Sequence, residues 1–349
     1  SGSKGFAKGA EIIRKEMKLS LPQVHFDPYK FEKWELNEEA EFIVGGQRIE
    51  AIPAAGGIGT SLEGIHGVLQ KSKNGFSLID PLTKDIRANI TVGSFGKGTT
   101  RSALRRDQAP LPSFSIGKQD VPLLENAERD KVPAWTKFVV RYTPDAEGFN
   151  IVGRLPGKQK KEILILAHAD TVYNTPGGND NTASVIVMLM LAHAAAARAN
   201  NHSITFVATG NEEFGMLGAN NYAEKCKQAG TFENFKYVIN FDSLTYGPNL
   251  WISSKQEDIK DILRSIHKDL QIKSTPIFDS SDGFVMDSEP FRHDGAKGLH
   301  ANSRGYDEKT LPVYHRPDDT ADAVPLDCVE SSFLVFDEFI KRIDKLGKY

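Results

Sequence analysis

Short apolar runs alternate with segments of helical periodicity along the second half of the chain. The expected strands cover residues 150–154, 162–167, 203–209 and 236–241, the expected helices cover residues 182–199, 218–228, 257–270 and 326–345, and residues 272–316 look loop-rich. Strands that alternate with helices predict an α/β domain with a largely parallel sheet. The apolar run within residues 182–199 is too short to span a bilayer comfortably, so it indicates a buried helix in which His193 packs in the core.

The first half of the chain has a different pattern. Residues 6–19 place apolar side chains at helical spacing, and Pro22 ends that pattern. In residues 42–140, short segments rich in β-forming residues are separated by Gly, Pro, Asn and Lys, which predicts a smaller, strand-rich module. It has no cluster of His, Asp and Glu at ligand-like spacing, so we expect a structural or substrate-shaping role. The chain thus divides into residues 1–41, whose helix packs on the larger domain, the strand-rich module, and the α/β domain of residues 141–349.

Groups that can bind metal or move protons gather where the expected strands end. They are His168, Asp170, Asp180, Glu212, Glu213 and Asp242. In an open α/β sheet, the carboxyl ends of parallel strands form the active site, so these side chains should converge. Five carboxylates and one histidine would repel one another there, and divalent cations relieve such repulsion. Histidine with carboxylate ligands suits zinc, and less specifically cobalt or manganese; a bridging carboxylate fits a pair of ions roughly 3.5–4 Å apart.

These residues lie in motifs that resemble those of a known family. The motifs are HAD at 168–170, GGNDN at 177–181, NEEFGMLGA at 211–219, NFDS at 240–243 and VYHRPDDT at 313–320. Their order and spacing resemble the co-catalytic zinc exopeptidases that include aminopeptidase Y, bacterial leucyl aminopeptidases and plasma glutamate carboxypeptidase. The resemblance covers residues 150–349 and implies a three-layer α/β/α sandwich with a mostly parallel mixed sheet. The strand-rich module occupies the place where many members carry a protease-associated domain.

The resemblance implies two bound zinc ions and indicates which residues would bind each of them. Asp180 would bridge both ions. His168 and Asp242 would complete the shell of one ion, and Glu213 and His315 that of the other. His293 and His300 lie in the same loop-rich region as His315, but the sequence YH followed by PDDT favours His315.

The resemblance also implies the residues that act on the substrate. Glu212 would be the general base, which takes a proton from water and later gives it to the leaving amine. Asp170 would hold the ring of His168, as metal-binding histidines commonly need. Tyr314 would donate to the oxyanion.

Some positions bear on substrate choice. Residue 169 is alanine where the family often has an aromatic residue, and Arg316 occupies a position where threonine is usual. Arg316 could reach a substrate carboxylate, or pair with Asp318 or Asp319 at the surface, which is the preferred interpretation. Candidates to line a pocket are Phe214, Met216, Tyr246 and Phe284.

Three other readings compete with this assignment. Dimetal carboxypeptidases and deacylases whose motif begins HxDTV carry the bridging aspartate further along and an inserted dimerisation domain. Here Asp180 follows His168 by 12 residues, and the 73 residues from Asp242 to His315 leave little room for an insertion. Glutaminyl cyclases use one zinc ion, and non-catalytic receptor-like modules lose ligands or the base, whereas this chain keeps the full set. We therefore favour an aminopeptidase acting on peptides or peptide-like amides, while a carboxypeptidase or a specialised amidohydrolase stays open.

The composition narrows the classes of partner. A formal net charge of −3 gives no electrostatic reason to expect nucleic acid or membrane as the main partner. Two cysteines, Cys226 and Cys328, exclude a disulfide framework and a CxxC site. The chain starts without a signal-peptide pattern, so we expect a soluble protein. Secreted and cytoplasmic locations both stay open, as does the oligomeric state.

Overall fold

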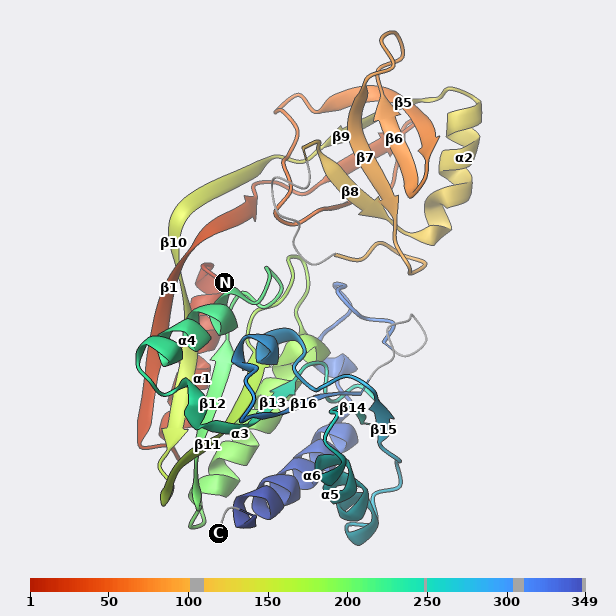
Figure 1. Cartoon of the computed structure of the whole chain (residues 1–349). Coiled ribbons are helices and arrows are strands. Elements are labelled where there is room, and N and C mark those ends of the chain that lie inside the picture. Colours follow the sequence, from red (N-terminus) through yellow and green to blue (C-terminus); the bar gives the residue numbers. More distant parts are fainter. Residues whose placement is uncertain (101–109, 248–249, 304–310, 347–349) are drawn as a thin grey trace.

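The computed structural model describes residues 1–100, 110–247, 250–303 and 311–346, which form two eight-stranded sheets. Figure 1 shows the larger sheet and its helices at one end of the molecule, the smaller sheet at the other, and a long two-stranded ribbon between them. Among these residues, no helix has both the length and the apolar character needed to cross a bilayer.

The larger sheet has the strand order β1-β10-β12-β11-β13-β16-β14-β15. Its strands are β1 (Gln23–Leu36), β10 (Val140–Leu155), β11 (Gln159–His168), β12 (His202–Thr209), β13 (Phe235–Phe241), β14 (Trp251–Ser253), β15 (Ile277–Asp279) and β16 (Lys297–Asn302). The central strands β12, β11, β13 and β16 are parallel to their neighbours in that group, whereas β1, β10 and β14 pair antiparallel. The sheet is therefore mixed and parallel at its centre, as predicted.

Helices cover both faces of the larger sheet. They are α1 (Lys4–Lys18), α3 (Ala183–Ala196), α4 (Leu217–Gln228), α5 (Glu257–Asp269) and α6 (Leu326–Lys345). Alternate side chains of β11 enter different cores, because successive residues of a strand point to opposite faces. Ile163 and Ile165 join the core formed with α1, α3, α5 and α6, and Leu164 and Leu166 join the core formed with α4. This confirms the predicted three-layer α/β/α sandwich.

The second sheet belongs to the strand-rich module and has its own core. Its strands are β2 (Glu41–Val44), β3 (Gln47–Arg48), β4 (Ile52–Pro53), β5 (Ile65–Ser72), β6 (Gly75–Ile79), β7 (Ile86–Val92), β8 (Ser113–Ile116) and β9 (Pro133–Lys137). Helix α2 (Val121–Arg129) packs on it, and the buried core includes Phe42, Leu69, Phe114 and Phe138. The paired strands β1 and β10 lead from this module into the larger sheet.

Short helical turns complete the described chain. They are η2 (Lys118–Asp120), η3 (Gly178–Thr182), η4 (Phe232–Asn234), η5 (Met286–Phe291) and η6 (Ala321–Ala323). Two of them, η3 and η5, lie in segments that reach the candidate site described below.

Several elements differ from the sequence-based expectation. Strand β1 lies in residues 1–41, for which only a helix was predicted, and β16 lies in the segment predicted to be loop-rich. Strand β16 lies at the centre of the sheet although it carries polar side chains. These side chains are tolerated there because the buried His300 ring contacts the Asn240 and Asn302 side chains. His193 is exposed on α3 instead of packed in the core.

Candidate metal centre

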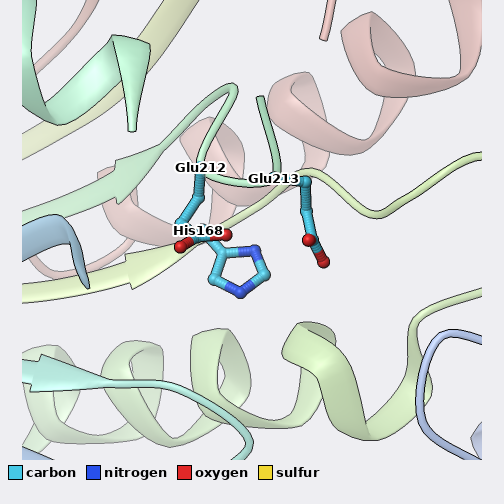
Figure 2. A group of neighbouring side chains, drawn as sticks. All are labelled: His168, Glu212 and Glu213. Carbon is cyan, nitrogen blue, oxygen red and sulfur yellow. The ribbon is translucent and has the colours of Figure 1, made fainter. Parts of the chain in front are cut away.

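The five predicted metal ligands come together at the carboxyl edge of the larger sheet. His168 ends β11, Asp242 follows β13, and Glu213 lies in the loop after β12. Asp180 lies in η3, and His315 lies in the loop that leads to α6. All five are buried. Figure 2 shows His168 opposite Glu212 and Glu213, with the three side chains pointing into a common space.

Asp180 lies between two groups of ligands and faces one histidine with each carboxylate oxygen. The His168 Nε2 atom lies 3.3 Å from Asp180 Oδ1 and 3.7 Å from Asp242 Oδ1. The His315 Nε2 atom lies 3.3 Å from Asp180 Oδ2 and 3.2 Å from Glu213 Oε1. Each of the two groups holds its three ligand atoms within 4.8 Å of one another. The arrangement has the form of a dimetal site with a shared carboxylate.

The hydrogen bonds of the two histidines fit metal binding. His168 Nδ1 lies 3.0 Å from the main-chain carbonyl oxygen of Asp170, and His315 Nδ1 lies 2.7 Å from that of Thr100. A carbonyl oxygen only accepts, so Nδ1 carries a proton in both rings, and Nε2, which faces the carboxylates, is the atom that would bind a metal ion after losing its own proton. A ligating histidine commonly has such a partner on its other nitrogen.

The loop that carries Asp180 depends on two glycines. Gly177 has a φ of +72°, which is costly for any other residue, and a Cβ there would lie 2.0 Å from the Thr171 side chain. A Cβ on Gly178 would lie 2.3 Å from the carbonyl oxygen of Thr320. The GGNDN motif therefore lets η3 pack against the loops on either side of it.

Asp319 holds the Asp180 loop in place, a role that the sequence analysis did not assign to it. Its Oδ1 accepts from Asn179 N–H (2.8 Å), and its Oδ2 accepts from Asp180 N–H (3.0 Å). Its main-chain carbonyl accepts from Gly178 N–H (2.8 Å). Because Asp319 follows His315 by four residues, its hydrogen bonds tie the loop that carries Asp180 to the loop that carries His315. The sequence signal that could have pointed to Asp319 was the PDDT motif that follows His315.

The residues with predicted catalytic roles lie beside these candidate ligands. Glu212 is buried, and its carboxylate lies near His168 and Glu213. The Glu212 N–H donates to Asp170 Oδ1 (3.0 Å), so the Asp170 carboxylate supports the Glu212 main chain. The main-chain carbonyl of Asp170 supports the His168 ring. The sequence analysis expected Asp170 to hold that ring, and its main-chain carbonyl oxygen makes the contact. The ring of Tyr314 stacks on His315 at 3.7 Å between centroids.

Asp287 is a second buried acid that the sequence analysis missed, because it lies in the segment predicted to be loop-rich. It belongs to η5, and the Thr209 hydroxyl donates to its carboxylate. Burial raises the pKa of Asp287 to about 7, although the charge of His168 opposes that shift. Asp287 adds to the acidic surroundings of Glu212, whose pKa also responds to it.

Arg316 and two of the pocket candidates, Met216 and Phe284, have different surroundings from those expected. Arg316 does pair with Asp318, with 3.5 Å between Nε and Oδ2, but the arginine is buried and not at the surface. Met216 and Phe284 pack in the core beside α4. Phe214 lines a cavity of about 370 Å³ beside the Glu212 loop. The cavity is also bordered by Trp34, Thr171, Tyr173 and Asn211.

The electrostatics of the metal-free site favour bound protons. Burial lowers the pKa of His315, but Glu213 and Asp180 raise it further, to about 10. The pKa of His168 is likewise raised well above its ordinary value by Asp180 and Asp242 against the effect of burial. Burial is the main cause that raises the pKa values of Glu212 and Glu213. Protons and metal ions therefore compete for these histidines and carboxylates.

A profile of Peptidase family M28 matches residues 150–339. That span is more than half of the chain and contains all five ligands. The chain belongs to peptidase family M28.

Three known proteins illustrate the similarity. The alkaline phosphatase isozyme conversion protein of Escherichia coli (strain K12) is 32% identical over 121 residues, which are 31% of this chain and 35% of that protein. Aminopeptidase YwaD of Bacillus subtilis (strain 168) is 26% identical over 235 residues, 63% of this chain and 49% of that protein. The solved structure of BSAP, a zinc aminopeptidase from Bacillus subtilis, matches with a TM-score of 0.75 and 19% identity and covers 100% of this chain and 91% of that one.

These similarities have different reach. The chain spans about a third to a half of the length of the first curated relatives. The match to the solved structure covers the whole chain, so the M28 fold with its strand-rich module is shared.

The first prediction concerns the stability of the metal-free M28 site as a function of pH. A histidine whose folded pKa is about 10 binds a proton more tightly in the folded than in the unfolded chain. Its contribution to the free energy of unfolding is therefore complete below pH 6.5 and is lost as the pH rises through about 10. We expect urea unfolding of the metal-free protein to show falling stability over this range. His315→Gln should flatten the profile, and a wild-type profile that rises with pH would contradict the assignment.

The second prediction concerns Asp319. Asp319→Ala leaves the buried N–H groups of Asn179 and Asp180 without their acceptor, so the free energy of unfolding should fall by about 3 kcal/mol. Asp318→Ala changes the neighbouring, exposed aspartate and should cost much less. Chemical unfolding of the two variants side by side gives the comparison. Equal losses would mean that the Asp319 hydrogen bonds do not hold the loop.

Proposed function

We propose that this protein is a metal-dependent aminopeptidase that hydrolyses the N-terminal peptide bond of peptides with two bound zinc ions. The observation that carries the proposal is the position of Asp180, which faces His168 with one oxygen and His315 with the other. Asp242 completes the first group and Glu213 the second. These two groups contain two histidine nitrogens and three carboxylates, which are ligands that zinc prefers.

The residues around the ions have separate tasks in this proposal. Bound zinc lowers the pKa of water and polarises a carbonyl group. Glu212 takes a proton from the attacking water as the water oxygen bonds to the carbonyl carbon, and passes that proton to the leaving amine as the C–N bond breaks. Its surroundings suit this task, since burial raises the pKa of Glu212 well above that of an exposed glutamate. Tyr314 donates to the oxyanion from its place beside His315.

Substrate polarity favours an aminopeptidase over a carboxypeptidase. A free α-amino group is a cation, and Glu212, Asp242 and Asp287 give it a buried, acidic environment. A carboxypeptidase needs a cation for the substrate carboxylate. Arg316 is the cation next to a ligand, and it already contacts the Gly98 carbonyl and Asp318. The curated relatives include proteins named as aminopeptidases, which supports the same choice.

Glu212→Gln separates metal binding from proton transfer. Glutamine keeps the size of the side chain but cannot accept the proton, so turnover should fall by about 10²–10⁴-fold. Metal analysis of the purified variant should still find about two zinc ions per chain, as in the wild type. Activity close to wild type would reject Glu212 as the base.

A set of dipeptides distinguishes the proposed activity from its alternatives. The zinc-loaded protein should cleave dipeptides with a free amino group and leave their N-acetylated counterparts intact, because acetylation removes the positive charge. Release of free amino acids, measured by chromatography, gives the rate for each pair. Preferred cleavage of the acetylated member would favour the carboxypeptidase or amidohydrolase reading. Removal of zinc with a chelator should abolish cleavage, and added zinc should restore it.

A further inference from the structure

The strand-rich module reaches the metal centre through residues 93–100, which we call the bridging loop. Lys118 N–H donates to the Phe95 carbonyl (2.9 Å), and the Ser115 hydroxyl donates to the Thr99 carbonyl (3.1 Å). Both donors belong to the strand-rich module, at and beside β8. The module therefore determines where the bridging loop lies.

The last described residue of this loop holds His315. The Thr100 carbonyl accepts from His315 Nδ1 (2.7 Å), and Thr100 N–H donates to the His315 carbonyl (3.1 Å). The Thr100 hydroxyl donates to the Tyr173 carbonyl (3.2 Å), in the segment that follows β11. Thr100 is 3% exposed, so water competes little for these bonds. The other histidine, His168, donates the equivalent hydrogen bond from Nδ1 to the Asp170 carbonyl, inside its own domain.

Arg316 fastens the bridging loop to the α/β domain. Its guanidinium donates to the Gly98 carbonyl, and its Nη2 lies 3.8 Å from Glu50 Oε1. The other oxygen of Glu50 accepts from Gly98 N–H (2.9 Å). Arg316 and Glu50 thus hold both polar main-chain groups of Gly98. Arg316 is 5% exposed, which distinguishes this contact from an exposed ion pair of small energetic effect.

We propose that Arg316 is a positioning residue that couples the strand-rich module to one half of the metal centre. It holds the bridging loop in place, the loop holds the His315 ring through Thr100, and the ring then presents Nε2 to the ion shared with Glu213. The ion held by His168 and Asp242 does not depend on this chain of contacts. The inference rests on the proposed dizinc function and adds that the two ions respond differently to the module.

Zinc binding by the whole 349-residue chain tests the coupling without any substrate. Metal-free wild type, Arg316→Ala and Arg316→Lys are titrated with Zn²⁺ in competition with a chromogenic chelator. In Arg316→Ala we expect one ion to bind about tenfold more weakly and the other to bind as in the wild type, because loss of an outer hydrogen bond to a ligand typically has such an effect. Lysine keeps a cationic donor, so Arg316→Lys should recover much of the affinity.

Two further variants control the result. Arg87→Ala removes an exposed arginine that pairs with Asp80 elsewhere in the strand-rich module, and it should bind both ions like the wild type. Glu50→Gln keeps an acceptor for Gly98 N–H but loses the charge that faces Arg316. It should show a smaller, equally selective loss, and it serves if Arg316→Ala fails to fold. Hydrogen exchange at the Thr100 amide should speed up in both Arg316→Ala and Glu50→Gln.

The outcomes separate the inference from the proposed function. Two ions in the wild type with unchanged binding in Arg316→Ala and Glu50→Gln would overturn the coupling and leave the dizinc proposal standing. An equal loss at both ions would also overturn it, because a general loss of stability does not select one ion. A wild type that binds no zinc would overturn the proposed function, and the coupling with it.

Discussion

The burial of negative charge at one edge of a sheet is the constraint on which the rest of this structure depends. The buried acids there are Asp170, Asp180, Glu212, Glu213, Asp242 and Asp287. An ionised carboxylate removed from water costs several kcal/mol unless a partner offsets the loss. In the metal-free protein, protons offset part of it, as the raised pKa values of the two site histidines and of Asp287 show. Divalent cations would replace those protons, so the same constraint makes the edge a candidate metal site.

The fold makes this cost tolerable because the ligands do not depend on one another alone for their positions. His168 and Asp242 come directly from adjacent parallel strands whose side chains fill two apolar cores. Asp180 and His315 come from loops, and Asp319 joins these loops by accepting three main-chain N–H groups of residues 178–180. Ligands on strands are fixed by the packed sheet, whereas ligands on loops need dedicated hydrogen bonds.

The sequence allowed the convergence of the five candidate ligands to be predicted because each follows a recognisable signal: the end of an apolar strand, a glycine pair or a motif. It predicted the central strands β11, β12 and β13 and the helices packed on the larger sheet for the same reason, since their periodicity reflects burial. It did not predict β1 and β16, in which polar residues alternate or are buried against other polar side chains. The roles of main-chain groups were also beyond reach. Nothing local in the sequence indicates that Thr100, more than two hundred residues away, would hold His315.

The position of Thr100 gives the strand-rich module a meaning that its composition did not suggest. In its described residues the module supplies none of the five candidate ligands, yet one of its carbonyl groups fixes the second histidine, and Arg316 secures that carbonyl through Gly98 and Glu50. The β1–β10 ribbon also joins the module to the larger sheet, so its placement is set at two points. The ribbon is long, and the module lies at its far end. The ribbon alone therefore does not fix the position of the module at the metal centre, and a contact near the centre is needed. The buried Arg316 contact meets that requirement, which accounts for an arginine directly after a metal ligand.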